Sequence, residues 1–172
     1  MFKKIRPLIF KFSPEVAHSL AIKTLKSNLI PSSKAIDSEI LKTKLFGKNI
    51  KNPIGVAAGF DKNAEVYNPL FNLGFGFVEV GTITPNPQYG NPKPRVFRLE
   101  EDKALINRLG FNNSGSDEIS ARIKKNSAHG LLGINIGPNK DTKNRVEDYL
   151  IGVDTPEDVQ KAEEVILEQE IR

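Results

Sequence analysis

The stretch NPIGVAAGFDKNAEVYNPLFNLGFGFVEVGT, residues 52–82, decides the fold of this 172-residue chain. Its apolar run from Ile54 to Ala58 is too short for a helix and predicts a buried strand. Ala64 to Leu73 carries apolar residues at helical spacing, and Phe77 to Val80 predicts a second strand. A strand, a helix and a strand of these lengths form a βαβ unit, in which the strands are parallel and the crossover is right-handed.

Small and charged residues follow each predicted strand. Gly59, Asp61 and Lys62 come directly after the first strand, and Gly81 and Thr82 come after the second. In parallel α/β folds, ligands bind at the carboxyl ends of the strands. The sequence therefore predicts a ligand site where these two turns meet. The first turn lacks the GxxxxGK[ST] pattern, which argues against a nucleotide P-loop.

The composition, with 38% hydrophobic and 27% charged residues, is that of a single globular domain. The chain has no cysteine, which excludes disulfides and thiolate metal sites. His18 and His129 are far apart and lack ligand spacing, so we expect no metal site. Because no long apolar run and no continuous N-terminal apolar stretch occur, we expect neither a transmembrane helix nor a secretory signal.

The net charge of +4 is unevenly distributed along the chain. Residues 1–53 contain eleven Lys and Arg against three acidic residues, a balance of +8. The remaining residues contain fourteen against eighteen, a balance of −4. A nucleic-acid-binding domain is typically basic over a whole binding face, with aromatic residues interleaved. We therefore expect no nucleic-acid partner.

Residues 1–44 predict a separate N-terminal helical segment. Its first part has the pattern of two short helices, the second with Ser13 as N-cap and Pro14 as its first residue. Two interpretations stand: a basic amphipathic hairpin that lies on an anionic membrane surface, or a helical cap packed on the domain with its lysines in water. The second helix carries an apolar stripe at helical spacing: Val16, Ala17, Leu20, Ala21, Thr24 and Leu25.

The rest of the chain alternates strand and helix patterns, joined by a long loop with four prolines between residues 85 and 94. Such a loop inside a compact domain is usually functional, and its turn chemistry predicts that it is ordered. The expected elements are a hairpin at Leu45–Ile50, strands at Arg95–Leu99 and Leu131–Ile136, an apolar stretch at Ala104–Leu109, helices at Ser116–Asn126 (with Ser116 as N-cap) and Val146–Ile151, and an acidic amphipathic helix from Asp154.

Taken in order, these segments resemble the N-terminal half of class 2, quinone-dependent dihydroorotate dehydrogenases. The matching residues are NPIGVAAGFDKN at 52–63, GFGFVEVGTITPNPQYGNPKPRVFRL at 74–99, LINRLGFNNSG at 105–115 and GINIGPNKDT at 133–142. The resemblance runs from the start of the chain to about Val153, and an N-terminal helical hairpin distinguishes this class. Pro138 departs from the pattern, because the family usually has another residue there.

The resemblance implies an α/β fold of the (β/α)8 TIM-type barrel, with FMN at its C-terminal mouth. Such an enzyme oxidises dihydroorotate to orotate in pyrimidine biosynthesis and passes the electrons to a quinone. Residues 45–153 would supply about three βα units of the barrel, and 154–172 would form an acidic helical tail that does not match the family. The location implied is peripheral, on the cytoplasmic side of a membrane.

The resemblance also assigns site residues. A fixed cation at Lys62 suits both a substrate carboxylate and an anionic reduced flavin. Plainer interpretations are tight packing for Ala57–Gly59, a surface ion pair with Asp61 for Lys62, and satisfaction of loop backbone for Asn107, Asn112 and Asn113. The residues implied to contact FMN are Ala57, Ala58, Gly59, Lys62, Thr82 and Asn135, and those implied to line the orotate pocket are Lys62, Asn107, Arg108, Leu109, Gly110 and Phe111.

The family's catalytic base has no counterpart in this sequence. That base is a serine in an N-[ILV]-S-S-P-N-T-like segment, which the 172 residues do not contain, so we assign no catalytic residue and expect no turnover by this chain alone. An open sheet of three parallel strands leaves an exposed edge, so we expect self-association or pairing with a missing half-barrel. The alternative function is a non-catalytic barrel fragment or a membrane-associated binding module.

Overall fold

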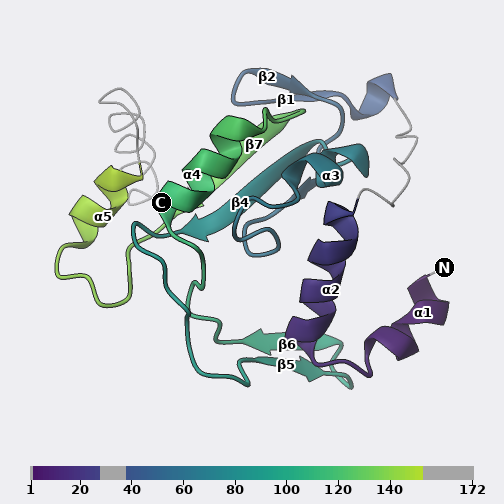
Figure 1. Ribbon diagram of the computed structural model, residues 1–172. Helices are drawn as coiled ribbons and strands as arrows, with labels where there is room; N and C mark the ends of the chain where they lie inside the picture. Colours follow the sequence, from purple (N-terminus) through teal and green to yellow (C-terminus); the bar gives the residue numbers. More distant parts are fainter. Residues whose placement is uncertain (1, 28–37, 153–172) are drawn as a thin grey trace.

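The computed structural model describes residues 2–27 and 38–152. Its centre is a parallel three-stranded sheet in the order β3–β4–β7, with helices α3 and α4 on one face (Figure 1). The strands are parallel and in chain order, as the βαβ prediction requires. The elements are α1 (Phe2–Ile9), α2 (Pro14–Lys26), a short 3-10 helix (Glu39–Leu41), β1 (Thr43–Leu45), β2 (Lys48–Ile50), β3 (Gly55–Val56), α3 (Tyr67–Asn72), β4 (Phe77–Ile83), β5 (Val96–Leu99), β6 (Ala104–Asn107), α4 (Ser116–Lys125), β7 (Leu131–Ile136) and α5 (Arg145–Ile151).

The described part of the chain forms part of an α/β barrel whose sheet does not close. Within it, β3 and β7 each have one neighbouring strand, and both pair with β4. The first strand, Gly55–Val56, is shorter than predicted because the chain turns out of the sheet directly after it. The Gly59 N–H donates to the Gly81 carbonyl at 2.8 Å, and the Gly81 N–H donates to the Asp61 carbonyl at 3.1 Å. These bonds bring the two predicted turns together at one edge of the sheet.

The crossover helix α3 begins at Tyr67, later than the predicted start at Ala64. The Asp61 carboxylate accepts hydrogen bonds from the N–H groups of Glu65 and Val66, both at 2.7 Å. Ala64 has a φ of +51°, a left-handed conformation that a helix cannot contain. The segment before α3 is therefore a turn organised by a carboxylate, and the helix starts only after it.

The hydrophobic core lies between the sheet and the helices. Val78 and Val80 of β4 pack with Leu70 of α3 and Ile119 of α4, and all four side chains are buried. Along β4, Val78 and Val80 alternate with side chains that face the other side of the sheet, as the two-residue period of a strand dictates. Burial of this apolar surface is the main stabilising contribution to the fold.

Helix α2 packs on this core through a face that coincides only in part with the predicted stripe. Leu25, a member of that stripe, is buried in the core cluster together with Ile22, which was not predicted. Val16 and Leu20, also members of the predicted stripe, are 47% and 45% exposed, so that part of the prediction is wrong. The helix is a packed cap whose opposite side presents apolar side chains outward. The helical period is compatible with burial of either apolar face, and contacts with the rest of the fold determine which face of α2 is buried.

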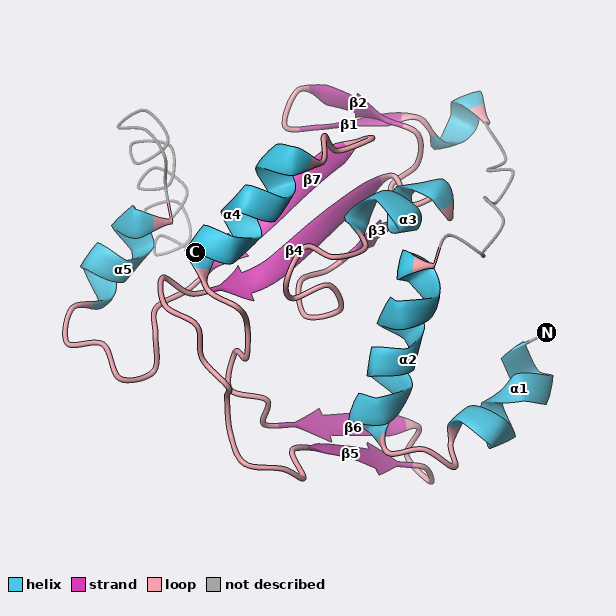
Figure 2. Cartoon of the chain, in the orientation of Figure 1, coloured by secondary structure: helices cyan, strands magenta, loops and turns pink. Residues whose placement is uncertain are grey.

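Two antiparallel hairpins stand outside the parallel sheet (Figure 2). The β1–β2 hairpin confirms the prediction for residues 45–50, with its turn at Phe46 and Gly47, where φ is +48° and +71°. In the β5–β6 hairpin Val96 pairs with Asn107, so the apolar stretch after residue 103 is the return strand of a hairpin. This second hairpin lies beside α2, away from the central sheet.

The last described elements are close to their predicted positions. Strand β7 matches, and α5 starts one residue earlier than expected, at Arg145. Gly115, with a φ of +83°, takes the N-cap position of α4, so the prediction for Ser116 is wrong. The Ser116 hydroxyl donates to the Pro85 carbonyl at 3.1 Å instead. The acidic helix predicted from Asp154 lies outside the described residues.

Candidate functional site

The carboxyl ends of the three parallel strands are tied together by polar side chains. The Thr82 hydroxyl donates to Asn135 Oδ1 at 2.6 Å, which connects the ends of β4 and β7. Asn135 Nδ2 donates to Glu79 Oε1 at 3.0 Å. The amide of Ala58, after β3, donates to the other Glu79 oxygen at 3.5 Å. Glu79 and Asn135 thus hold all three strand ends at fixed positions.

A cavity of about 550 Å³ opens at these strand ends. It brings together nearly all the residues implied by the sequence resemblance. Ala57 does not line it, and Asn135 lines a neighbouring cavity of about 540 Å³ that shares Thr82, Gly110 and Phe111. The lining of the first cavity is Ala58, Gly59, Lys62, Gly81, Thr82, Asn91, Asn107, Arg108, Leu109, Gly110, Phe111 and Asn112.

Lys62 supplies a positive charge to this cavity. Its ammonium donates to the Gly59 carbonyl, which holds the side chain beside the strand ends. Burial lowers the pKa of Lys62 below its ordinary value of 10.5, and the neighbouring Arg95 lowers it further, while the carboxylates of Glu15 and Asp61 oppose the shift. A partly desolvated ammonium attracts an anionic ligand more strongly than a lysine in free solution does.

Asp61 does not form the surface ion pair that the plainer interpretation predicts. Its side chain is 1% exposed and accepts two backbone N–H bonds at the start of α3, and no ion pair with Lys62 occurs in residues 2–27 and 38–152. Burial raises the pKa of Asp61, and the hydrogen bonds from Glu65 and Val66 partly offset that rise. Asp61 is therefore a structural residue of the turn that presents Lys62.

Replacing Asp61 by Ala is expected to lower the free energy of unfolding by about 2 kcal/mol, because two buried backbone N–H groups lose their acceptor. Urea titration of the two proteins measures the change. The variant Asp61→Asn keeps one acceptor oxygen and should lose about half as much. Equal losses in the two variants would show that the hydrogen bonds to Glu65 and Val66 are not the cause.

The same variant has an expected pH dependence. Because folding raises the pKa of Asp61 above its ordinary value of 3.8, the stability that this carboxyl contributes is fully present below that value. It declines as the pH rises through the raised pKa. The gap in stability between wild type and Asp61→Ala should therefore be largest in acid and smaller at neutral pH. A gap that grows with pH would contradict the raised pKa.

Residues 107–112 line this cavity and belong to the segment 107–113, which we call the substrate loop after the role that the sequence resemblance implies for it. Its backbone is held by the proline-rich loop. The Asn91 N–H donates to the Leu109 carbonyl at 3.0 Å, and Asn91 Nδ2 donates to the Arg108 carbonyl at 2.7 Å. The Asn107 side chain accepts from the Leu109 N–H at 3.4 Å. The predicted backbone lining of residues 108–111 is therefore ordered by neighbours rather than by regular secondary structure.

Asn112 was not among the predicted site residues. Its Oδ1 is buried and has no hydrogen-bond partner in the described part of the chain. Buried polar atoms are nearly always paired, so this oxygen is available to accept from a bound water or ligand. The sequence offers one signal for it, the Asn-Asn-Ser run at 112–114, which has the turn composition of many ordinary loops.

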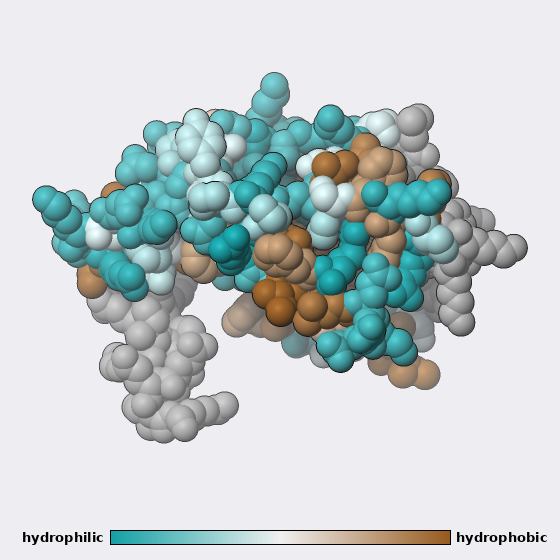
Figure 3. Space-filling view, turned by 90° about the horizontal axis from the view of Figure 1, so that it is seen from below, coloured by the Kyte–Doolittle hydropathy of each residue, from teal (hydrophilic) through white to brown (hydrophobic). Residues whose placement is uncertain are grey.

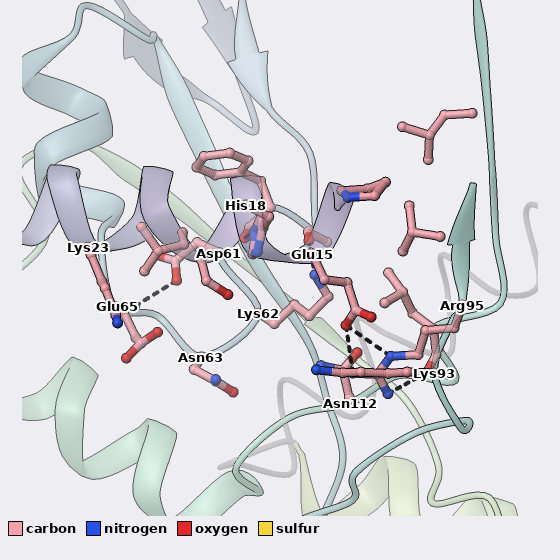
Figure 4. A pocket seen from close by; sticks show the side chains of 18 of the residues that line it. Glu15, His18, Lys23, Asp61, Lys62, Asn63, Glu65, Lys93, Arg95 and Asn112 are labelled. Atoms are coloured by element: carbon pink, nitrogen blue, oxygen red, sulfur yellow. Dashed lines mark hydrogen bonds and ion pairs between the residues drawn. The ribbon is translucent and has the colours of Figure 1, made fainter. Parts of the chain in front are cut away.

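A third cavity of about 580 Å³ lies between α2 and the turn after β3. Figure 4 shows Lys62, Glu15, Arg95 and Asn112 gathered in one part of it. His18 Nε2 donates to the Phe60 carbonyl at 2.7 Å along the same wall. Four residues line both this cavity and the one at the strand ends: Gly59, Lys62, Leu109 and Asn112. The two cavities are thus neighbours, separated by single side chains.

No group of three or more His, Cys, Asp or Glu side chains suited to a metal ion occurs among residues 2–27 and 38–152. The charged residues that line the cavity at the strand ends are Lys62 and Arg108, and backbone and amide donors line it beside them. This donor set suits an anionic organic ligand.

Comparison with known proteins gives consistent results. The family model described as "Dihydroorotate dehydrogenase" matches residues 40–167. The "Dihydroorotate dehydrogenase (quinone)" of Rhizobium meliloti (strain 1021) is 54% identical over 147 residues, which cover 86% of this chain and 41% of that protein. The protein of the same name from Rhodospirillum rubrum is 52% identical over 147 residues, covering 86% of this chain and 40% of its own length.

Solved structures agree with these relatives. The DHODH of Eimeria tenella in complex with ferulenol aligns with a TM-score of 0.76 at 45% identity, covering 81% of this chain and 40% of that chain. The ligand-free form of the same protein gives 0.74 at 46% identity, covering 79% and 40%. The chain thus spans about two-fifths of the length of the proteins that it matches.

Proposed function

The chain belongs to the dihydroorotate dehydrogenase family, and we propose that it forms the part of a quinone-dependent enzyme that binds FMN and orotate. One observation carries this proposal: a lysine and several amide and backbone donors converge on a single cavity at the strand ends. A planar anionic ligand requires this combination of one fixed cation, directional donors and small residues that allow close approach.

The strand ends fit a flavin. A Cβ placed on Gly59 would meet no heavy atom within 4 Å, so the space over this residue is open. Ala58 and Thr82 beside it are small, which lets a flat ring approach the backbone. We assign the FMN contacts to Ala57–Gly59, Thr82, Asn135 and Lys62. FMN, when bound, accepts the hydride that dihydroorotate gives up.

Lys62 and the substrate loop bind and orient orotate in this proposal. The ammonium of Lys62 pairs with the substrate carboxylate, and the Asn107 side chain and the backbone of residues 108–111 line the ring. Asn112 joins this set, because its unpaired buried Oδ1 suits a ring N–H of the substrate. None of these groups is a proton acceptor placed for the reaction, and we assign none as the base.

The cavity beneath α2 is our proposed quinone site. Its lining combines the apolar side chains of Ile22 and Leu105 with the polar groups of His18 and Glu15. A quinone has an apolar body and polar carbonyl oxygens, which match such a lining. The shared wall of Lys62 and Asn112 places this cavity next to the proposed flavin, as electron transfer between the two requires.

Peripheral membrane attachment is part of the proposal. No helix within residues 2–27 and 38–152 is long and apolar enough to cross a membrane. Seen from the β5–β6 side, apolar side chains gather in a patch among hydrophilic ones (Figure 3). Leu8, Phe12, Leu20 and Ile106 are among the large apolar residues exposed on α1, on the connection to α2, on α2 and on this hairpin. Such a surface, with basic neighbours, suits insertion into the interface of an anionic membrane.

Flotation tests this attachment. The chain is expected to float with vesicles of anionic lipid at low salt, and the double change Phe12→Glu and Leu20→Glu should weaken binding by about tenfold, since two apolar side chains lose their burial. Tyr89, which is 95% exposed and lies in the proline-rich loop, outside α1, α2 and the β5–β6 hairpin, gives the control Tyr89→Glu, expected to float like the wild type. Equal flotation of all three proteins would remove this surface from the proposal.

The experiment that tests the function is an absorption titration of the purified chain with FMN, followed by dihydroorotate and a quinone dye. We expect perturbed flavin absorption when FMN binds and a further shift of that absorption when orotate is added. We expect no bleaching, because the serine segment is not among these 172 residues. Failure to take up FMN would favour the alternative, a non-catalytic binding module. Bleaching by dihydroorotate would mean that a proton acceptor lies within this sequence.

A further inference from the structure

Gln88, in the proline-rich loop, contacts the substrate loop through both its backbone and its side chain. Its N–H donates to the Asn113 carbonyl at 3.1 Å, and the Asn113 N–H donates back at 3.0 Å. Its side-chain Nε2 donates to the carbonyls of Gly110 at 3.2 Å and Phe111 at 3.1 Å. Both amide N–H donors of Gln88 are therefore used on the loop that forms the proposed orotate pocket.

The acceptor side of the same amide connects to the loop after β7. Gln88 Oε1 accepts from Asn139 Nδ2 at 3.0 Å and from the Lys140 N–H at 3.1 Å. Asn139 has two further partners. Its Nδ2 donates to the Asn86 carbonyl at 2.8 Å, and its Oδ1 accepts from the Asn86 N–H at 2.9 Å. Its backbone N–H donates to Asp148 of α5 at 2.7 Å. The two amides thus join three loops and one helix.

We propose that Gln88 and Asn139 form a clamp that positions the substrate loop over the cavity containing Lys62. The proposal rests on the function proposed above and concerns how its orotate pocket is held. Neither residue lines that cavity, although both line the neighbouring cavity that contains Thr82 and Asn135, so toward the orotate pocket both are positioning residues. The clamp connects the loops after β4 and β7, and therefore fixes the pocket wall to the same framework that carries Thr82 and Asn135.

The conformation of the substrate loop explains why a clamp is required. Gly110 and Phe111 both have positive φ, +74° and +51°, and a bulky residue rarely adopts this left-handed region. The Phe111 carbonyl accepts from Gln88 Nε2 and also from Asn113 Nδ2 at 2.8 Å. Because β6 ends at Asn107, no regular hydrogen-bond ladder holds the loop, and it depends on donors such as these two and Asn91.

Hydrogen exchange of the ligand-free chain tests the clamp directly. In Gln88→Glu the donors that face two carbonyls are replaced by a carboxylate oxygen, so the amides of residues 107–113 should exchange at least about tenfold faster. Asn139→Asp should give the same pattern, and the double variant should add little. Asn68→Asp is the matched control, since Asn68 bridges to Ser127 and His129 far from the pocket.

Ligand affinity separates positioning from mere stability. In the FMN-loaded chain, Gln88→Glu should weaken orotate binding by about tenfold while leaving FMN affinity within about twofold. Gln88→Met is neutral and similar in size to glutamine, and it should weaken orotate binding to the same extent as Gln88→Glu. It replaces Gln88→Glu in the experiment if the charged variant does not fold. Unchanged loop exchange, or faster exchange with unchanged orotate affinity, would overturn the clamp. If the wild type itself binds no orotate, the proposed function fails, and the exchange experiment alone decides whether the clamp exists.

Discussion

Replacing Arg95 by Met is expected to lower the free energy of unfolding by about 3 kcal/mol, because it leaves a carboxylate and loop carbonyls without their shared donor. Arg95 is 6% exposed. Its Nε and Nη2 donate to Glu15 at 3.0 and 2.9 Å, and its Nη1 donates to the carbonyls of Tyr89 at 2.6 Å and Asn91 at 3.0 Å. One guanidinium therefore connects α2 to the proline-rich loop.

Urea unfolding of wild type, Arg95→Met and Arg98→Met measures this contribution. Arg98 lies on the same hairpin and makes one short bond, to the Phe12 carbonyl at 2.8 Å, so its loss should cost about 1 kcal/mol. Arg95→Lys keeps the positive charge, but an ammonium cannot bond Glu15 and the Tyr89 carbonyl at the same time as the planar guanidinium does. Its stability should therefore lie between those of the wild type and Arg95→Met. Equal losses of unfolding free energy in Arg95→Met and Arg98→Met would show that the buried Arg95–Glu15 pair contributes no more than a single exposed hydrogen bond.

Changing Lys62 to Met is expected to weaken orotate binding by the FMN-loaded chain by about 100-fold. The substitution keeps an unbranched side chain and removes the ammonium, and a hydrogen-bonded ion pair in a desolvated site contributes about 2 to 3 kcal/mol. Isothermal titration with orotate measures the effect. The control is Lys93→Met: Lys93 lines the cavity beneath α2 together with Lys62 but does not line the cavity at the strand ends.

The pH dependence of this binding is a second readout. Burial lowers the pKa of Lys62 below 10.5, so in the free protein the ammonium is lost as the pH rises through that lowered value. Orotate affinity of the wild type should therefore begin to fall at a pH below 10.5, and Lys62→Met should lack this transition. If Lys62→Met bound orotate as tightly as the wild type at neutral pH, Lys62 would not belong to the orotate site.

Local sequence patterns were sufficient for the framework. The apolar run before Gly59 and the strand that reaches Gly81 follow from periodicity, and two short strands separated by one helix favour parallel pairing through a right-handed crossover. That pairing places Lys62 and Thr82 at one edge of the sheet before any coordinates are known. The substrate loop could be recognised only through family resemblance, because its composition is that of many loops.

Other features depended on contacts between distant segments. Ser116 satisfies the local rule for an N-cap, yet its hydroxyl donates to Pro85, and Gly115 takes the cap position. Ala64 fits a helical pattern, but the buried carboxylate of Asp61 holds the preceding residues in a turn and delays the helix. A tertiary hydrogen bond in the first case, and side-chain hydrogen bonds over four and five positions in the second, outweighed a local propensity of about 1 kcal/mol or less.

The sequence by itself determined the order of the strands, the parallel sheet and the residues that follow each strand, since these depend on neighbours within a few positions. Only the tertiary structure decided which face of α2 is buried, that Arg95 pairs with Glu15 across 80 positions, and that Gln88 reaches Asn139. Such pairs leave no periodic trace, because a side-chain amide or guanidinium finds its partner through the fold of the whole chain and not through the spacing of its neighbours.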